Sequence, residues 1–134
     1  PMDRYGGGNR LCPQETNVLQ NFSVAENIYM SDLKLLRKRE KRRWLPFRGF
    51  KAIYGKTEQL LKHIKVNLDP RADVRKLSVG QQQMLMIARA LATNPKVLIL
   101  DEPTTSLSSS DVEGLFEVVR ALKEKGTSVI FCYT

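Results

Sequence analysis

Cysteine, histidine and long apolar runs are scarce in this chain, and each scarcity argues against a class of protein. The two cysteines, Cys12 and Cys132, lie far apart and have neither the spacing of metal ligands nor the density of a disulfide scaffold. No apolar run approaches the length of a membrane span, and the first residues lack the basic and apolar regions of a signal peptide. We therefore expect a cytoplasmic protein whose 134 residues form one domain with a modest core.

Basic residues outnumber acidic ones, which gives the chain a formal net charge of +8. They gather in the stretch 34–51, which contains one acid, Glu40, and the aromatic residues Trp44, Phe47 and Phe50. Such a patch indicates either binding to nucleic acid or anionic lipid, or a solvated helix and loop. We favour the solvated surface, because no recognised nucleic-acid motif accompanies the patch.

The sequence pattern of the N-terminal half predicts helices. Residues 1–10 are rich in glycine, and we expect an irregular turn that leads into the first ordered segment. Ser23 and Glu26 have the spacing of a capping box, in which each side chain accepts a hydrogen bond from the other's backbone N–H, so a helix is expected to begin there. A second helix is expected from about Lys51 to Ile64, after a break at residues 44–49. Its apolar side consists of Ile53, Leu60, Leu61 and Ile64.

The back of the chain alternates helix and strand. Ser78 is a suitable cap for a helix that stops at Asn94-Pro95. The apolar face of this helix consists of Met84, Leu85, Ile87, Ala88 and Leu91. Val97–Leu100 is a short, continuously apolar run, which is typical of a parallel strand buried on both faces.

A further helix and strand complete the pattern. Ser110 and Glu113 have capping-box spacing, and Gly126 is a suitable helix stop. The apolar stripe between them consists of Val112, Leu115, Phe116, Val119 and Leu122. Residues 128–132 form a second apolar strand, so strand, helix and strand make a βαβ unit. The sequence therefore predicts an α/β protein, with a helical front and a piece of parallel sheet behind it.

Two carboxylates follow the first of these strands directly. A strand that ends in Asp101-Glu102 places both at the carboxyl edge of a parallel sheet, where α/β folds bind ligands. One carboxylate there is suited to a magnesium ion, and its neighbour is suited to orienting or deprotonating an attacking water. The competing interpretation is that both residues only cap the following turn.

The segment Ser78–Gln81 places a hydroxyl and an unencumbered backbone at a helix N-terminus. Free N–H groups and the helix dipole favour an anion there, such as a terminal phosphate, and Gly80 would let it approach the backbone. An ordinary capped helix start would look the same, so this signal gains weight only together with the carboxylates.

Taken together, Leu77–Gln83 and Val97–Pro103 resemble the signature motif and Walker B strand of ATP-binding-cassette (ABC) ATPases in order and spacing. We call Leu77–Gln83 the signature segment. Gln14-Glu15 followed by Phe22–Ile28 is similar to the family's Q-loop and adjoining helix. Residues 101–108 resemble Walker B passing into the D-loop.

Within that family, Leu68-Asp69-Pro70 and Leu77–Leu91 look most like the subunits that energise bacterial importers of ribose, galactose or xylose. The resemblance implies a partial P-loop NTPase (ABC ATPase) fold. It divides the chain into residues 1–22 with the Q-loop, a helical subdomain at 23–76, and the signature helix, Walker B strand, D-loop and βαβ unit at 77–134.

The resemblance also implies roles for individual residues, with ATP and Mg²⁺ as cofactors. Glu102 would be the general base, Asp101 would serve the metal, and Gln14 would sense the metal and the attacking water. Contacts to the γ-phosphate of ATP held by an opposing cassette would come from Ser78, Val79, Gly80 and Gln81. The implied partners are a second cassette, a transmembrane permease and, indirectly, a sugar-binding protein, at the inner face of the cell membrane and without nucleic acid.

The chain departs from the family pattern in two ways. No Gly-x-x-x-x-Gly-Lys-Ser/Thr, the loop that holds the phosphates of ATP, occurs in it. The position of the family's switch histidine falls on Thr134, whereas the one histidine, His63, lies in the helical region and is expected at the surface. We therefore expect part of a cassette, or a degenerate one, with low or absent hydrolysis by the chain alone.

Two other functions are compatible with the sequence. The first is a soluble ABC ATPase that does not act in transport, against which the sugar-importer-like helical segment argues. The second is a non-catalytic module whose basic stretch binds nucleic acid or anionic lipid. Binding of that kind would weaken steeply with salt and would not depend on Glu102.

Overall fold

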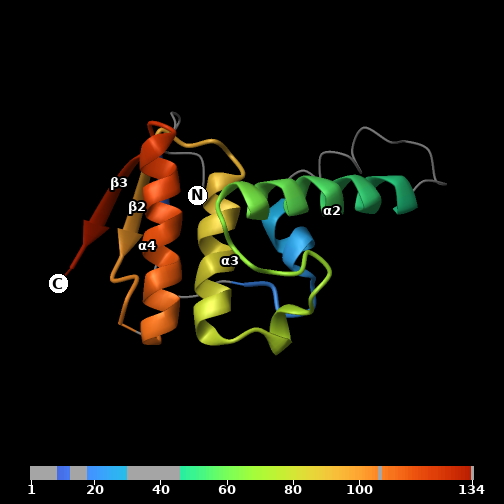
Figure 1. The fold of residues 1–134 in the computed structure, drawn as a ribbon. Coiled ribbons are helices and arrows are strands. Elements are labelled where there is room, and N and C mark those ends of the chain that lie inside the picture. The colour runs from blue at the N-terminus through green and yellow to red at the C-terminus, as the bar shows by residue number, and fades with distance from the viewer. Residues whose placement is uncertain (1–8, 13–17, 30–45, 106, 134) are drawn as a thin grey trace.

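A three-stranded parallel sheet and the helices packed against it form the described part of the chain (Figure 1). The computed structural model describes residues 9–12, 18–29, 46–105 and 107–133. Residues 24–29 are helical. The other elements in chain order are β1 (Asn9–Cys12), α2 (Pro46–His63), the short 3-10 helix η1 (Val74–Lys76), α3 (Val79–Leu91), β2 (Val97–Asp101), α4 (Ser109–Glu124) and β3 (Ser128–Cys132). The predicted α/β architecture is confirmed.

β2 is the central strand, parallel to β1 on one side and to β3 on the other. Ile99 pairs with Leu11 across the first ladder and with Ile130 across the second. The βαβ unit is therefore present, but the expectation of an irregular turn up to residue 10 is wrong, because β1 begins at Asn9. This short segment has no strand pattern of its own, and its extended form depends on pairing with β2.

One face of β2 is buried and the other is only partly covered. Leu98 and Leu100 are buried within the core, whereas Val97 and Ile99 on the opposite face remain partly exposed. The prediction of burial on both faces is therefore wrong for the second face. The physical reason is that the described helices pack on one face of the sheet (Figure 1).

α3 runs through the centre of the core. All the apolar residues predicted for its buried face are buried: Met84, Leu85, Ile87, Ala88 and Leu91. The same continuous core includes Leu61 and Ile64 from the α2 region, Leu98 from β2 and Leu115 from α4. α3 therefore joins the helical front to the sheet.

α2 confirms the second predicted helix but begins earlier than expected. It starts at Pro46 rather than near Lys51, because a proline in the first turn loses no intrahelical hydrogen bond and its fixed φ suits a helix. The predicted apolar side lies in the core, with Ile53, Leu61 and Ile64 buried and Leu60 partly buried. The helix ends at His63, two residues before Lys65, which takes the left-handed conformation at φ 58°.

The N-cap of α4 lies two residues before the predicted cap. Its N-cap is Ser108, not Ser110, because Asp111 rather than Glu113 occupies the third helical position and completes the capping box. Leu115 and Leu122 are buried as predicted, together with Val118 and Ala121, but Phe116 is exposed. Gly126, at φ 83°, follows the end of the helix as predicted.

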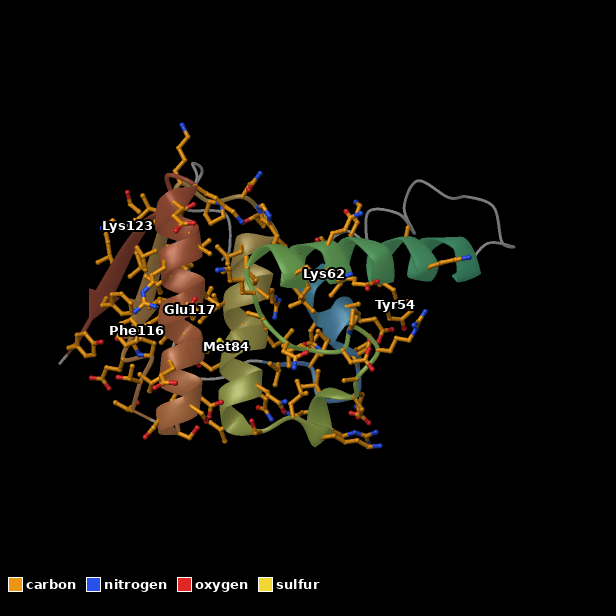
Figure 2. All side chains as sticks on the ribbon, viewed as in Figure 1. Tyr54, Lys62, Met84, Phe116, Glu117 and Lys123 are labelled. Carbon is orange, nitrogen blue, oxygen red and sulfur yellow. The ribbon has the colours of Figure 1, made fainter. Side chains whose placement is uncertain are left out.

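The outer surface of the helices is polar and strongly charged. Figure 2 shows Tyr54 and Lys62 on α2 and Glu117 and Lys123 on α4; of these, Lys62, Glu117 and Lys123 are exposed and Tyr54 is partly so. Most of the basic stretch 34–51 lies outside the described residues. Among the residues that are described, no helix is both long and apolar enough to cross a membrane.

Candidate functional site

The signature segment and the end of β2 meet at one end of the molecule. α3 and α4 both begin at this end, and the parallel strands β2 and β3 both point toward it (Figure 1). The carboxyl edge of a parallel sheet and the N-termini of two helices therefore share one region. In α/β proteins this is where ligands bind, and helix N-termini there favour negative charge.

Ser78 begins α3 in the manner of a capped helix. Its hydroxyl accepts a hydrogen bond from the backbone N–H of Gln81 at 3.2 Å, and its own N–H donates to the Gln81 side-chain oxygen at 2.9 Å. Val79 is 55% exposed although it is apolar, whereas Gly80 is buried. The start of α3 is thus rigidly formed, with an exposed side chain at its first helical position.

The two predicted carboxylates stand at the end of β2. Asp101 is the last residue of the strand, and Glu102 takes the left-handed conformation at φ 39°. The Glu102 N–H donates to the carbonyl oxygen of Cys132 at 2.9 Å, which fixes this turn to the end of β3. Both carboxylate residues are partly buried. Asp101 in the strand and Glu102 in the left-handed conformation thus place two carboxylates at one edge of the sheet.

Asp111, at the start of α4, lies against the start of α3. A Cβ atom built on Gly80 would overlap the carboxylate of Asp111, so only glycine fits at position 80 with this neighbour in place. Asp111 in turn accepts hydrogen bonds from the Ser108 hydroxyl at 2.6 Å and the Ser108 N–H at 3.3 Å. The carboxylate is therefore held in contact with the signature segment.

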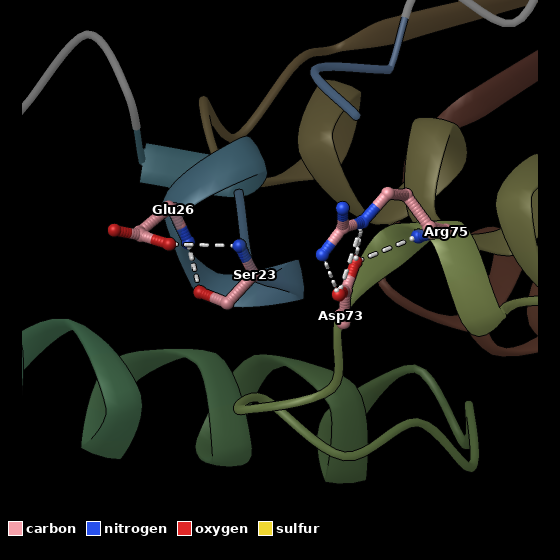
Figure 3. Close-up of polar contacts among 4 residues, drawn as sticks. All are labelled: Ser23, Glu26, Asp73 and Arg75. Carbon is pink, nitrogen blue, oxygen red and sulfur yellow. Dashed lines mark hydrogen bonds and ion pairs between the residues drawn. The ribbon is translucent and has the colours of Figure 1, made fainter. Parts of the chain in front are cut away.

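The chain that leads into Ser78 is held by an ion pair between Asp73 and Arg75 (Figure 3). Asp73 also accepts the Arg75 N–H at 3.0 Å and caps η1. Hydrogen bonds from the Arg75 guanidinium, followed by the one from its backbone N–H, lower the pKa of Asp73 from 3.8 to about 2. The carboxylate consequently remains charged well into the acidic range.

The helical residues 24–29 are tied to the same approach to α3. The backbones of Ser23 and Asp73 form an isolated antiparallel β-bridge. The Val24 N–H also donates to the Ala72 carbonyl oxygen at 3.1 Å. The predicted capping box is confirmed, because the Ser23 N–H donates to the Glu26 carboxylate at 2.7 Å and the Glu26 N–H donates to the Ser23 hydroxyl at 3.3 Å (Figure 3).

Of the residues predicted for the site, Ser78, Val79, Gly80 and Gln81 lie together at the start of α3, and Asp101 and Glu102 lie at the end of β2. Gln14 and Thr134 lie outside the described residues. His63 is exposed at the end of α2 and lines a shallow hollow of about 350 Å³ with Tyr29, Lys56, Gln59 and Leu60. The residues described by the structure contain no group of three or more His, Cys, Asp or Glu side chains that could hold a metal ion.

Sequence reasoning missed Ser108 and Asp111. The signal was present in the Ser-x-x-Asp spacing, because an aspartate at the third helical position completes the same capping box as a glutamate. Two overlapping serine patterns competed, and Ser110 with Glu113 had the more usual residue pair. The packing of Asp111 against Gly80 decides between them and is a tertiary contact that local spacing does not reveal.

Comparison with known proteins identifies relatives over nearly the whole chain. The family model described as ABC transporter matches residues 2–105. A putative ribose/galactose/methyl galactoside import ATP-binding protein of Agrobacterium fabrum is 37% identical over 131 residues, which are 98% of this chain and 24% of that protein. A ribose import ATP-binding protein of Streptomyces avermitilis is 40% identical over 98% of this chain and 25% of its own length. The chain therefore spans about a quarter of these relatives.

Solved structures give the same result for the fold. A dimeric post-hydrolysis state of an ATP-binding cassette bound to ADP and Pi has a TM-score of 0.67 and 27% identity, over 93% of this chain and 51% of that one. A nucleotide-free ATP-binding cassette from an ABC transporter has a TM-score of 0.69 at 24% identity, which bears on the fold alone.

Proposed function

The chain belongs to the ABC transporter family, and from that premise we propose that it is part of an ATPase subunit that powers the import of a simple sugar. One observation carries the proposal. The start of α3, formed by the signature segment, and the two carboxylates at the end of β2 lie at the same end of the fold (Figure 1). The names of the relatives, ribose and galactose import ATP-binding proteins, support the choice of cargo.

In this proposal the start of α3 binds the γ-phosphate of ATP that is held by a second, opposing cassette. Ser78, Gly80 and Gln81 contribute a hydroxyl, the backbone of the first helical turn and a fixed amide side chain, with Val79 exposed beside them. The positive end of the α3 dipole favours the phosphate charge.

Glu102 acts in this proposal as the general base, and Asp101 serves the metal. The Glu102 carboxylate accepts the proton of the water that attacks the terminal phosphate. Its backbone bond to Cys132 keeps it next to the end of β3. Mg²⁺, when bound, would neutralise charge on the phosphates, and an aspartate oxygen at a strand end is the hard ligand that this ion prefers. Because Mg²⁺ is usually held by one or two carboxylates together with the phosphates and waters, a single aspartate fits that role.

The partners in this proposal are a second cassette, a membrane-embedded permease and, through it, a sugar-binding protein. Residues 23–76 would form the helical subdomain that faces the permease at the inner face of the membrane. Residues 77–134 would carry the signature, the carboxylates and the D-loop that follows them. Gln14, within the segment 1–22, would sense Mg²⁺ and the attacking water and couple them to the permease.

The first test is Mg-ATP binding and hydrolysis by the 134-residue chain, for which we expect little turnover because it contains no Gly-x-x-x-x-Gly-Lys-Ser/Thr loop. The decisive test grafts these residues in place of the matching 131-residue stretch of a ribose import relative. We expect the graft to hydrolyse Mg-ATP and Glu102→Gln to reduce its kcat by about a hundredfold or more, since a general base contributes that much.

Glu113→Gln, an exposed carboxylate on α4, is the matched control and should leave turnover unchanged. A folded graft that binds no nucleotide would contradict the proposed function as a whole. Turnover that survives Glu102→Gln would remove the general-base role. Salt-sensitive binding of nucleic acid or anionic vesicles in either case would favour the basic module instead.

A further inference from the structure

The packing of Asp111 against Gly80 has no counterpart in the roles proposed so far. Gly80 lies in the first turn of α3 and is buried, and the atoms nearest to a Cβ built there are the carboxyl carbon and both carboxylate oxygens of Asp111. Among the described residues, nothing lies within 4 Å of a Cβ built on the helical glycines Gly55 and Gly114. The absence of a side chain at position 80 is therefore matched to one particular carboxylate.

The Asp111 carboxylate has little freedom to move away. Its Oδ2 atom accepts hydrogen bonds from the Ser108 hydroxyl at 2.6 Å and the Ser108 N–H at 3.3 Å. The Asp111 N–H donates to the Ser108 hydroxyl oxygen at 3.2 Å. Rotation away from Gly80 would break the bonds to the carboxylate, which is also favoured by the positive dipole ends of two helices.

We propose that Asp111 is a positioning residue that fastens the start of α4, and with it the preceding turn at residues 103–105, to the start of α3. Glycine at position 80 is then required for this contact, and not only for the approach of a phosphate. The purpose of the coupling rests on the proposed function, because it would keep the phosphate-binding backbone of the signature segment in register with the turn that follows Glu102.

The test is a double-mutant cycle on the chain itself, read from urea unfolding. Gly80→Ala should lower the urea midpoint when Asp111 is present, because the new methyl group displaces the carboxylate from its cap. In an Asp111→Ala background the same change should raise the midpoint or leave it unaltered, since alanine is the better helix former. Glu113→Ala, on the same helix, is the control background. In it, Gly80→Ala should still lower the urea midpoint.

Hydrogen exchange separates positioning from simple capping of α4. The N–H of Gln82 donates to the Ser78 carbonyl oxygen at 2.9 Å and reports on the first turn of α3. Asp111→Ala should speed its exchange at least fivefold, whereas Ser108→Ala, which removes the cap hydroxyl but keeps the carboxylate, should act mainly on α4. An equal effect of Gly80→Ala in all three backgrounds would overturn the proposal, as would unchanged exchange at Gln82 in Asp111→Ala.

The proposed function is tested separately by the graft. There, Gly80→Ala should lose ATP turnover and Asp111→Ala should restore part of it. If the graft is inactive in every form, the proposed function fails, while the unfolding cycle still decides whether Asp111 couples the two helices.

Discussion

At the scale of single residues, the segment before the signature is controlled by one carboxylate. The Asp73 carboxylate caps η1 and forms an ion pair with Arg75, and the Asp73 backbone forms an isolated β-bridge with Ser23. Unlike the β-bridge, the cap and the ion pair depend on the charge of Asp73. Its pKa falls from 3.8 to about 2 because the Arg75 side chain and backbone both donate hydrogen bonds to it. A depressed carboxyl pKa stabilises the fold above the pKa of the unfolded chain and loses this contribution as the pH falls.

Asp73→Asn should therefore change the pH dependence of stability in a defined window. In the parent chain the contribution of Asp73 is complete above about pH 4 and disappears as the pH falls toward about 2. The variant should be less stable at about pH 6 and should show a shallower loss over the acidic window, as measured by urea unfolding at several pH values. Glu113→Gln is the control. If Asp73→Asn and the parent chain lost the same unfolding free energy between about pH 4 and pH 2, Asp73 would not be the source of this pH dependence.

At the scale of helices, the glycines make opposite predictions because their backbone conformations differ. Gly126 ends α4 at φ 83°, where an alanine would be strained, so Gly126→Ala should lower the unfolding free energy by about 1 kcal/mol. Gly114 lies inside α4 at an exposed position, and no described residue comes within 4 Å of a Cβ built there. Gly114→Ala should therefore raise the unfolding free energy by about 0.5–1 kcal/mol.

Urea unfolding of the two variants measures this contrast within one helix. If both substitutions stabilised the chain, Gly126 would not hold a left-handed conformation. If both destabilised it, Gly114 would have a packing role that the described side chains do not show.

The same elements show which features the sequence predicts and which it does not. Helix starts marked by one suitable cap, such as Ser23 with Glu26 or Ser78 alone, are found where the pattern indicates. The N-cap of α4 lies two residues before the predicted one, because Asp111 rather than Glu113 occupies the third helical position and completes the capping box with Ser108. The sequence does not predict β1, because this strand depends on hydrogen bonds from β2 rather than on its own residues.

In the candidate site, too, features that depend on local sequence can be predicted, whereas those that depend on distant contacts cannot. Asp101 and Glu102 lie where an apolar strand ends, so their place at the sheet edge could be predicted from local order alone. The role of Gly80 could be argued only in general terms, because the residue that fills the space beside it is 31 positions away, at Asp111.

At the scale of the whole molecule, one core connects the helical front with the sheet. Ile64, just after α2, belongs to the same cluster as Leu98 of β2 and Leu115 of α4, and it is 1% exposed. Lys125 also donates a hydrogen bond to the His63 carbonyl oxygen at 3.1 Å, which links the ends of α4 and α2. The described residues should therefore unfold as one cooperative unit.

Ile64→Val tests this cooperativity. It should reduce the unfolding free energy by about 0.5–1.5 kcal/mol and lower the protection of the slowest-exchanging amides in β2 by the same amount. Ile130→Val removes the same methylene from a residue that is 47% exposed and should cost less than half as much. Loss of protection confined to α2 would mean that the front opens independently of the sheet.

The left-handed backbone of Glu102 has a consequence for any attempt to improve this chain by selection. At φ 39° a glycine would relieve strain that a residue with a side chain must bear. A screen that rewards only heat resistance should thus tend to replace the glutamate by glycine and, in our proposal, would discard the catalytic base along with the strain. If Glu102 is the base, as we propose, stability and catalysis make opposite demands on this position, so thermostable variants should be chosen with Glu102 kept unchanged.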